Sequence, residues 1–423
     1  MSAASLSIRP LASDEEYTVY FRMAVAAFST HPSEEVVQRR KHSLHKSPVF
    51  RPEQVRGAFR DGQLVGGYIM HEHQLRMGAA RISTGCIGTV VTSTQHRNQG
   101  IASALMQDAI EFARQHNHAL LLLDGIPNFY YRYDYTDMFD VSLVEVDRSA
   151  ILARTPPASQ IRVATVDDAA ALLALYKRHC QRYTGSFERS LELQTYHLQY
   201  ARNPTMVALS GQGQITGYLR HSPEADTHMG MEIAADNWDA LLTLLHYHAS
   251  IFEHDKAPTS LQYLLPLDSP MTQWMIDTLE VPDTSHWDAP SLEWGVRAMS
   301  YHHRFAGWMA RLTDLHLLMR SILPELQARW RRSLAQWTGD ITLTVAGETC
   351  TLQVAGDDVQ IAATPTASSS HLELTAQAVV QLVFGYRALS QLTDLAHLPD
   401  DTSSALSILF PTGHTWIPAS DWF

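Results

Sequence analysis

Alternation of apolar and polar positions divides the first third of the chain into strands and one clear helix. Residues 55–70 contain two apolar runs around an Asp-Gly pair, which is typical of a tight hairpin. Residues 81–92 predict another strand, residues 101–114 place apolar side chains on one helical face, and residues 119–123 predict a short buried strand. The order strand, glycine-containing turn, helix and strand indicates a βαβ unit.

A weaker copy of this pattern recurs about 150 residues later. SIRPLASDEEY at 7–17 resembles QIRVATVDDAA at 160–170, and DGQLVGGY at 61–68 resembles GQGQITGY at 211–218. The second copy has no counterpart of the glycine-containing turn at 97–102. Two related domains in tandem explain both matches, and the second is expected to have lost the ligand of the first.

The pattern of apolar and polar residues changes again from about residue 299. Residues 308–330 predict a helix, residues 340–364 predict three strands separated by Ala-Gly turns, and residues 373–392 predict a second helix. Residues 405–423 are too apolar for a frayed tail, so we expect a docked C-terminus.

Length and composition fit a folded protein of several domains. The 423 residues exceed what one hydrophobic core usually serves, and the pattern predicts domains at 1–152, 153–298 and 299–423. No signal peptide and no apolar run of about 18 residues is found, so a cytoplasmic protein without a membrane partner is expected. A net charge of -12 without a basic stripe argues against nucleic acid. The three cysteines and 22 histidines show no metal-ligand spacing, so no metal is expected.

Two segments carry the candidate chemistry. In the first, a strand leads into RNQGIA at 97–102 and a helix begins at once, which exposes backbone N–H groups to an anionic ligand. The second, NFYYRYDYTD at 128–137, follows one helix and one strand later. Together they resemble the GNAT N-acetyltransferase superfamily, whose motifs run Arg/Gln-x-x-Gly-x-Gly/Ala and Phe-Tyr-x-x-x-Gly-Tyr/Phe. Asp134 stands where the family prefers Gly, and Asp tolerates the positive φ of such a turn.

The order of the domains narrows the resemblance. HRNQG, FYYRYDY, VFGYRAL and the terminal DWF lie in places that match the enhanced intracellular survival (Eis) type of acetyltransferase. This resemblance implies an α/β (α+β) protein with two tandem GNAT-like mixed-sheet domains, followed by a sterol-carrier-like α+β domain. It also implies acetyl-CoA as co-substrate and a homo-oligomer, perhaps a hexamer.

The resemblance assigns the coenzyme site to consecutive residues. The pantetheine arm is expected along Val90, Val91 and Thr92, although Val90 and Val91 also suit a plain sheet core. The diphosphate is expected at the turn and the first residues of the helix, namely Arg97, Asn98, Gln99, Gly100, Ile101, Ala102 and Ser103.

Two catalytic groups follow from the same resemblance. Tyr130 corresponds to the general acid, because a phenol of pKa about 10 stays protonated at neutral pH. The terminal carboxylate of Phe423 corresponds to the general base. A purely structural aromatic cluster at Tyr130 and a terminus that only packs through Trp422 and Phe423 remain open alternatives.

The leading hypothesis is acetyl transfer from acetyl-CoA to a primary amine, with aminoglycosides and lysine side chains among the acceptors. A lipid-binding protein that works through the C-terminal domain is an alternative from another class. An acyl-CoA sensor without turnover is a third reading.

Overall fold

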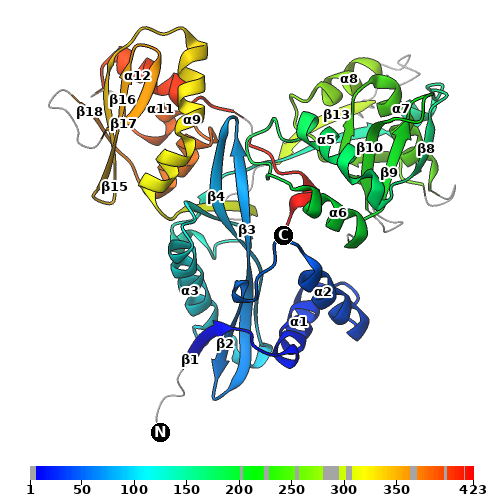
Figure 1. The fold of residues 1–423 in the computed structure, drawn as a ribbon, viewed down its shortest axis with the longest axis horizontal. Coiled ribbons are helices and arrows are strands. Elements are labelled where there is room, and N and C mark those ends of the chain that lie inside the picture. The colour runs from blue at the N-terminus through cyan, green and yellow to red at the C-terminus, as the bar shows by residue number, and fades with distance from the viewer. Residues whose placement is uncertain are drawn as a thin grey trace, which may run out of the picture. The chain divides into compact units, whose positions relative to one another are not determined.

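The computed structural model describes residues 6–200, 203–222, 228–252, 257–279, 295–301, 307–362, 369–394, 398–413 and 415–423. These residues form three sheets, which lie in two compact units (Figure 1). The first unit comprises Met1–Phe139, His303–Thr415 and Phe423, and the second comprises Asp140–His302 and Trp416–Trp422. The expected mixed α/β class is confirmed.

The first unit contains a seven-stranded sheet in the order β1-β2-β3-β4-β5-β14-β6. Its strands are β1 Leu6–Pro10, β2 Val55–Arg60, β3 Gln63–Met77, β4 Ala80–Thr92, β5 Leu120–Gly125, β6 Thr136–Asp137 and β14 Gly307–Leu312. Its helices are α1 Asp14–Phe28, α2 Glu34–Lys46 and α3 Ile101–Gln115, with short 3-10 turns η1 Pro52–Gln54, η2 Thr94–His96 and η3 Tyr131–Tyr133. The predicted hairpin, strands and helix of this region are confirmed.

Helices cover this sheet on both faces. Apolar residues of α3, including Leu105 and Phe112, pack against Tyr68 and Met70 of β3 on one face. Tyr17, Tyr20 and Phe21 of α1 pack on the other face. Below, these are called the α3 face and the α1 face.

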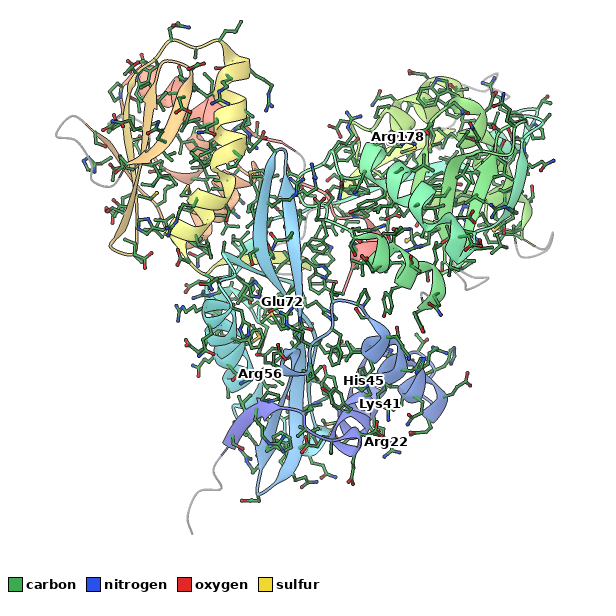
Figure 2. All side chains as sticks on the ribbon, viewed as in Figure 1. Arg22, Lys41, His45, Arg56, Glu72 and Arg178 are labelled. Carbon is green, nitrogen blue, oxygen red and sulfur yellow. The ribbon has the colours of Figure 1, made fainter. Side chains whose placement is uncertain are left out.

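An ion pair fixes α3 to the sheet. Arg56 of β2, labelled in Figure 2, donates two hydrogen bonds of 2.7 Å to Asp108 of α3. Because α3 carries the predicted phosphate site at its first turn, this contact helps to fix that turn against the strands.

The second unit repeats the same order of elements around its own seven-stranded sheet, β8-β9-β10-β11-β12-β7-β13. The strands are β7 Val141–Asp147, β8 Gln160–Val163, β9 Thr205–Leu209, β10 Ile215–His221, β11 Met229–Ala235, β12 Ser260–Tyr263 and β13 Val296–Tyr301. The helices are α4 Arg148–Leu152, α5 Ala169–His179, α6 Leu191–Tyr200, α7 Trp238–Ser250 and α8 Pro270–Thr278, with the 3-10 turns η4 Val166–Asp168 and η6 Ala419–Asp421. In this order β11, α7 and β12 correspond to β4, α3 and β5.

Each of these sheets takes in a strand from a distant part of the sequence. β14 lies between β5 and β6 in the first sheet, and β7 lies between β12 and β13 in the second. The boundaries at residues 152 and 298 stay a prediction. β7, which falls in the predicted first domain, belongs to the second sheet, and β14, which falls in the predicted third domain, belongs to the first sheet.

The rest of the first unit is a small α+β layer. Strands β15 Gly339–Val345, β16 Glu348–Ala355, β17 Asp358–Ala362 and β18 Ser370–Glu373 accompany helices α9 Leu315–Ser333, α10 Ala376–Val383, α11 Leu389–Leu392 and α12 Asp400–Leu409. The three predicted strands are confirmed, apart from residues 363–364, which lie outside the described part of the chain.

Two predicted helices differ from the structure. The segment predicted as one helix from 308 begins as strand β14, whose short apolar run does not distinguish strand from helix without its neighbours. The helix predicted over 373–392 is two helices, because Gly385 has a φ of +69° and ends α10. Close to the chain end, Trp416, Ile417 and Ala419 are at most 5% exposed, which confirms a docked terminus.

Candidate active site

The central feature of the first sheet is a fork between two parallel strands. β4 and β5 pair only over Thr84–Cys86 and Leu120–Leu122, although β4 continues to Thr92 and β5 to Gly125. Beyond Cys86 the edge of β4 that faces β5 has no ladder partner in β5. An unpaired strand edge of this kind offers N–H and C=O groups to a ligand that carries amides.

A bulge in β4 lies at the opening of this fork. The register with β3 shifts between Gly67 and Ile69, so that two residues of β4, Thr89 and Val90, oppose a single residue of β3. Thr89 has a φ of +53°, and the buried Tyr20 hydroxyl donates a 2.8 Å hydrogen bond to its carbonyl oxygen. Helix α1 therefore holds the bulge in place.

The loop after β4 leaves the amino end of α3 open. Gly100 is the N-cap with a φ of +78°, and no side chain caps the helix at this position. A Cβ added at Gly100 would meet no atom within 4 Å, so the space above it is free. Asn98 also has a positive φ, of +60°. The exposed first-turn amides and the positive end of the helix dipole suit a diphosphate.

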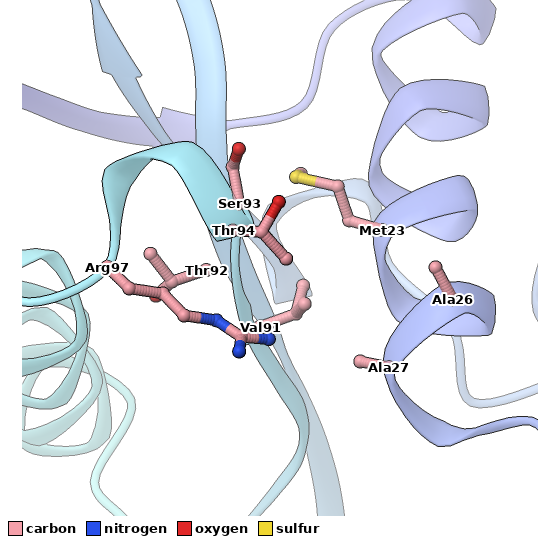
Figure 3. A pocket seen from close by; sticks show the side chains of 8 residues that line it. All are labelled: Met23, Ala26, Ala27, Val91, Thr92, Ser93, Thr94 and Arg97. Atoms are coloured by element: carbon pink, nitrogen blue, oxygen red, sulfur yellow. The ribbon is translucent and has the colours of Figure 1, made fainter.

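A free cation stands beside this helix end. Arg97 is exposed and makes no ion pair or hydrogen bond with the described residues. It borders a cavity of about 150 Å³ on the α1 face (Figure 3), which is lined by Met23, Ala26, Ala27, Val91, Thr92, Ser93, Thr94 and Arg97. A guanidinium next to three hydroxyl groups suits an anion better than an amine.

The structure brings the two predicted motifs into direct contact. The Tyr133 hydroxyl donates a 2.8 Å hydrogen bond to Oγ of Ser103, in the first turn of α3. Asp134 has a φ of +64°, which confirms that an Asp fills the left-handed turn position where the family prefers Gly. Tyr133 is therefore a further functional candidate, which the sequence analysis does not single out although it lies inside the second motif.

Tyr130 lies at the end of the fork on the α3 face. Its side chain is 7% exposed and packs with Tyr135, Met309 and the half-buried Val90. Burial, with a smaller contribution from Asp124, raises the pKa of Tyr130 to about 12. Its hydroxyl makes no hydrogen bond with the described residues, so the donor is available to a ligand.

The last residue of the chain lies on the α1 face of β4. A Cβ added at Gly88 would come within 3.3 Å of the carboxyl carbon of Phe423, so only glycine allows this approach without displacement. The Phe423 ring packs edge-on against Trp308 at 5.3 Å and lies 6.0 Å from the ring of His71. The two predicted catalytic groups therefore flank β4 from its two faces.

His71 is a second basic group beside the terminus, which the sequence reading considered only as a metal ligand. Its Nε2 would lie 3.3 Å from a Cβ at Gly88. Burial lowers the pKa of His71 to about 4, so the ring is neutral at neutral pH. A base of that strength has no advantage over a carboxylate as a proton acceptor, and the neutral ring supplies no positive charge beside it.

The other residues that are predicted to bind the coenzyme lie at the end of β4, in the loop after it and in the first turn of α3. Val91 is 5% exposed and belongs to the α1-face core, whereas Thr92 and Ser103 are half-buried. Ile101 is 1% exposed, and its side chain serves the core of α3 rather than the ligand. The side chain of Gln99 accepts a hydrogen bond from Arg60. Backbone amides, not these side chains, are what the loop presents.

The comparisons with known proteins agree with this geometry. Residues 7–138 match the acetyltransferase (GNAT) domain family. No curated protein matches the chain in sequence. The matched segment contains the fork between β4 and β5, the loop before α3 and Tyr130.

Solved structures share the fold along the whole chain. A GCN5-related N-acetyltransferase from Kribbella flavida superposes with a TM-score of 0.69 at 17% identity, over 99% of this chain and 100% of that one. A conserved protein of Enterococcus faecalis V583, described as a probable N-acyltransferase, gives 0.73 at 17% identity with both chains fully covered. Eis1 from Mycobacterium abscessus gives 0.62 at 16% identity, over 99% and 100%. The chain thus has the fold of tandem GNAT domains followed by an α+β domain.

The described residues contain neither a membrane-spanning helix nor a cluster of metal ligands. No helix in this part of the chain has both the length and the apolar character needed to cross a membrane. Within the same residues, no three His, Cys, Asp or Glu side chains gather closely enough to hold a metal ion. Cys86, Cys180 and Cys350 are buried free thiols.

Proposed function

We propose that this protein transfers an acetyl group from acetyl-CoA to a primary amine by direct attack within a ternary complex. The observation that carries the proposal is the pair of proton-transfer groups on opposite faces of β4 at the open fork. Tyr130 lies in the α3-face core, and the carboxyl carbon of Phe423 lies beside Gly88.

The coenzyme end of the site fits the residues present. The open edge of β4 suits the amides of pantetheine, and the amides after Gly100 together with Arg97 suit the diphosphate. Bound there, acetyl-CoA supplies an activated acyl carbon on a thioester. Thr92 and Ser93 lie between the two subsites along the chain.

The carboxylate of Phe423 takes a proton from the incoming amine. An alkyl amine of pKa near 10 arrives mostly protonated, so its nitrogen needs a proton acceptor before or during attack. Before attack the ammonium gives one proton to the carboxylate, which passes it to water. As the carbon–nitrogen bond forms and the carbon–sulfur bond breaks, the nitrogen loses its second proton to the carboxylate and the sulfur acquires negative charge.

Tyr130 acts on that departing sulfur. With a pKa of about 12 it remains protonated at neutral pH and donates to the developing thiolate. Because a thiol has a pKa of about 8.5, the phenol holds the proton more tightly at equilibrium. Its largest effect is therefore on the transition state, where it stabilises the charge as it appears.

The acceptor class that we propose is a polycationic small molecule or a lysine side chain, with aminoglycosides included. The net charge of -12 supports this choice, since an acidic surface attracts cationic substrates. We also propose that the enzyme works as a homo-oligomer, which light scattering on the purified protein would test. A panel of aminoglycosides, polyamines and lysine peptides, scored by coenzyme A release, would rank the acceptors.

The decisive experiment extends the chain beyond Phe423. A two-glycine extension removes the carboxylate from its place beside Gly88 and should lower kcat about 100-fold, the usual effect of a general base. Coenzyme affinity, measured by calorimetry, should stay within about twofold. The matched control carries the same extension at the N-terminus. Full activity of the C-terminally extended enzyme would show that the base lies elsewhere.

A further inference from the structure

The loop that carries Tyr130 is held by an arginine from a distant part of the sequence. Arg311 of β14 donates from Nε to the carbonyl oxygen of Tyr133 at 2.8 Å, and from one terminal nitrogen to the carbonyl oxygen of Leu312 at 2.8 Å. Its other terminal nitrogen lies 3.7 Å from a carboxylate oxygen of Asp134. All of these residues belong to the first unit. The acetyl-transfer steps described above do not use Arg311.

Two side chains of β14 support this loop. Met309 and Arg311 are two positions apart and therefore lie on the same face of the strand. That face is the α3 face, because Met309 belongs to the same apolar core as Tyr130. Gly125 of β5 leaves room for both Met309 and Tyr130, since a Cβ there would lie 2.9 Å from the Tyr130 ring and 3.0 Å from the Met309 sulfur. One strand thus supports the ring through Met309 and the turn after it through Arg311.

The hydroxyl group of Tyr130 is fixed only indirectly. It makes no hydrogen bond with the described residues, so its place is set by the packing of the ring and by the backbone of the loop. This backbone forms a single 3-10 turn, in which the N–H of Tyr133 donates to the carbonyl of Tyr130 at 2.9 Å. A contact that fixes Tyr133 therefore also fixes the backbone from which the Tyr130 side chain projects.

The burial of Arg311 argues against a role in stability alone. Its side chain is 11% exposed whereas that of Asp134 is 60% exposed, so the ion pair between them is partly solvated. Withdrawing a guanidinium from water costs free energy, and a pair with a solvated carboxylate offsets little of that cost. An apolar side chain would fill the same place at a smaller cost. What an apolar residue does not supply is the directed hydrogen bond to Tyr133.

We propose that Arg311 is a positioning residue for acetyl transfer, which holds the carbonyl of Tyr133 and thereby keeps the hydroxyl of Tyr130 aligned with the departing sulfur. A general acid works within about 2.6–3.2 Å of its proton acceptor, and a displacement of about 1 Å costs up to about 100-fold in rate. The inference rests on the proposed function, because it needs Tyr130 to be the acid. It gives β14, a strand of the predicted third domain, a part in the chemistry of the first fold.

The test is a double-mutant cycle with the full-length protein. Arg311→Lys keeps the charge but not the forked contacts. We expect kcat to fall about tenfold while the Kd for acetyl-CoA stays within about twofold, as measured by coenzyme A release and calorimetry. In a Tyr130→Phe background the same substitution should leave kcat unchanged, because the group that Arg311 positions is already absent. A merely structural defect would lower kcat by the same factor in both backgrounds.

A second variant and a matched control complete the design. Arg311→Met fills the same space without any donor, so it should show the same non-additivity with a larger loss of kcat. The control is Arg329→Lys in α9. Arg329 is nearly as buried, at 14% exposed, and likewise donates to a backbone carbonyl at 2.8 Å, that of Leu409. Its other hydrogen bond goes to Glu325 of the same helix, so this variant should keep full activity.

The outcomes separate this inference from the proposed function. If Tyr130→Phe is itself fully active, the proposed acid is wrong. If Tyr130→Phe loses activity while Arg311→Lys is fully active, or if Arg311→Lys costs the same factor in both backgrounds, the acid stands and the positioning role is wrong. Loss of coenzyme binding in Arg311→Lys would show that the arginine supports the whole fold, and would overturn the positioning role as well.

Discussion

The amino ends of α3 and α7 occupy the same place in two copies of one fold, yet the two helices are capped differently. At α3 the N-cap is Gly100, with a φ of +78° and no capping side chain. At α7 the N-cap is Asn237, whose side chain accepts a 2.8 Å hydrogen bond from the backbone N–H of Ala240. One helix end keeps its first-turn amides open to an anion, and the other uses its own side chain in the anion's place.

Charged residues shortly before the two caps reinforce this difference: Arg97 lies three positions before Gly100, and Asp236 directly precedes Asn237. Arg97 precedes α3 as an exposed cation that has no partner among the described residues. Asp236 precedes α7 and is paired with Arg178 at 2.6 Å and with His179 at 2.9 Å. An acidic side chain at that position repels a phosphate. Two folds with the same order of elements can therefore differ in ligand binding through a few residues at one helix end.

We propose that the chemistry takes place in the first fold, so loss of its proton donor, Tyr130, should have the largest effect. Tyr130→Phe removes the hydroxyl and keeps the ring in its core, so kcat should fall about 100-fold while coenzyme affinity stays nearly intact. Steady-state kinetics by coenzyme A release, together with calorimetry, would measure both. The exposed neighbour Tyr131 provides the control, because Tyr131→Phe should be fully active. Unchanged turnover in Tyr130→Phe would remove Tyr130 from the mechanism.

A smaller effect is expected at the open helix end. Gly100→Ala adds a methyl group where the ligand approaches and strains a positive φ, so the Kd for acetyl-CoA should rise about tenfold with little change in kcat. Gly62 is a matched control in the same unit, with the same φ of +78° and free space around its Cβ position. Both variants should lose about 1 kcal/mol of stability, but Gly62→Ala should bind the coenzyme normally. Equal Kd values for the two variants would contradict a phosphate site at α3.

The smallest effect on activity is expected at α7. Asn237→Ala removes a helix cap and should cost about 1 kcal/mol in the free energy of unfolding of the second unit, as followed by chemical denaturation. Acetyl transfer should stay within about twofold of the unsubstituted enzyme. A second coenzyme site in this variant, seen as a calorimetric stoichiometry of two, would show that the cap alone closes the second fold.

Local elements were predictable where one strong signal dominated. The Asp-Gly turn, the strand over 81–92 and the helix from residue 101 follow from turn chemistry and periodicity. Their predicted bounds lie within a few residues of the observed ones. The pattern over 308–330 predicts a helix where β14 is a strand, because WMARL is a short apolar run that suits either conformation. Its strand conformation depends on pairing with β5 and β6 on either side. The sequence of such a run does not show which strands will pair with it.

The residues of the loop before α3 could be predicted from the sequence, whereas the residues that pack around the site could be predicted less well. Gly100 and Tyr130 stand in motifs with fixed spacing, so the sequence points to both residues, and their roles stay a prediction. Tyr20, which supports the bulge at Thr89, and His71, which lies beside the terminus, were not identified, because each comes from an element distant in sequence.

The sequence by itself determined the turn that opens α3, the repetition of the fold and an apolar chain end that has to dock. Tertiary structure alone decided that β14 joins the first sheet and β7 the second, that Gly88 admits the carboxyl group of Phe423, and that Arg189 and Glu232 meet Asp421. The physical reason is range: turns and caps are set by neighbouring residues, whereas pairing of strands and burial of charges depend on groups that only the folded chain brings together.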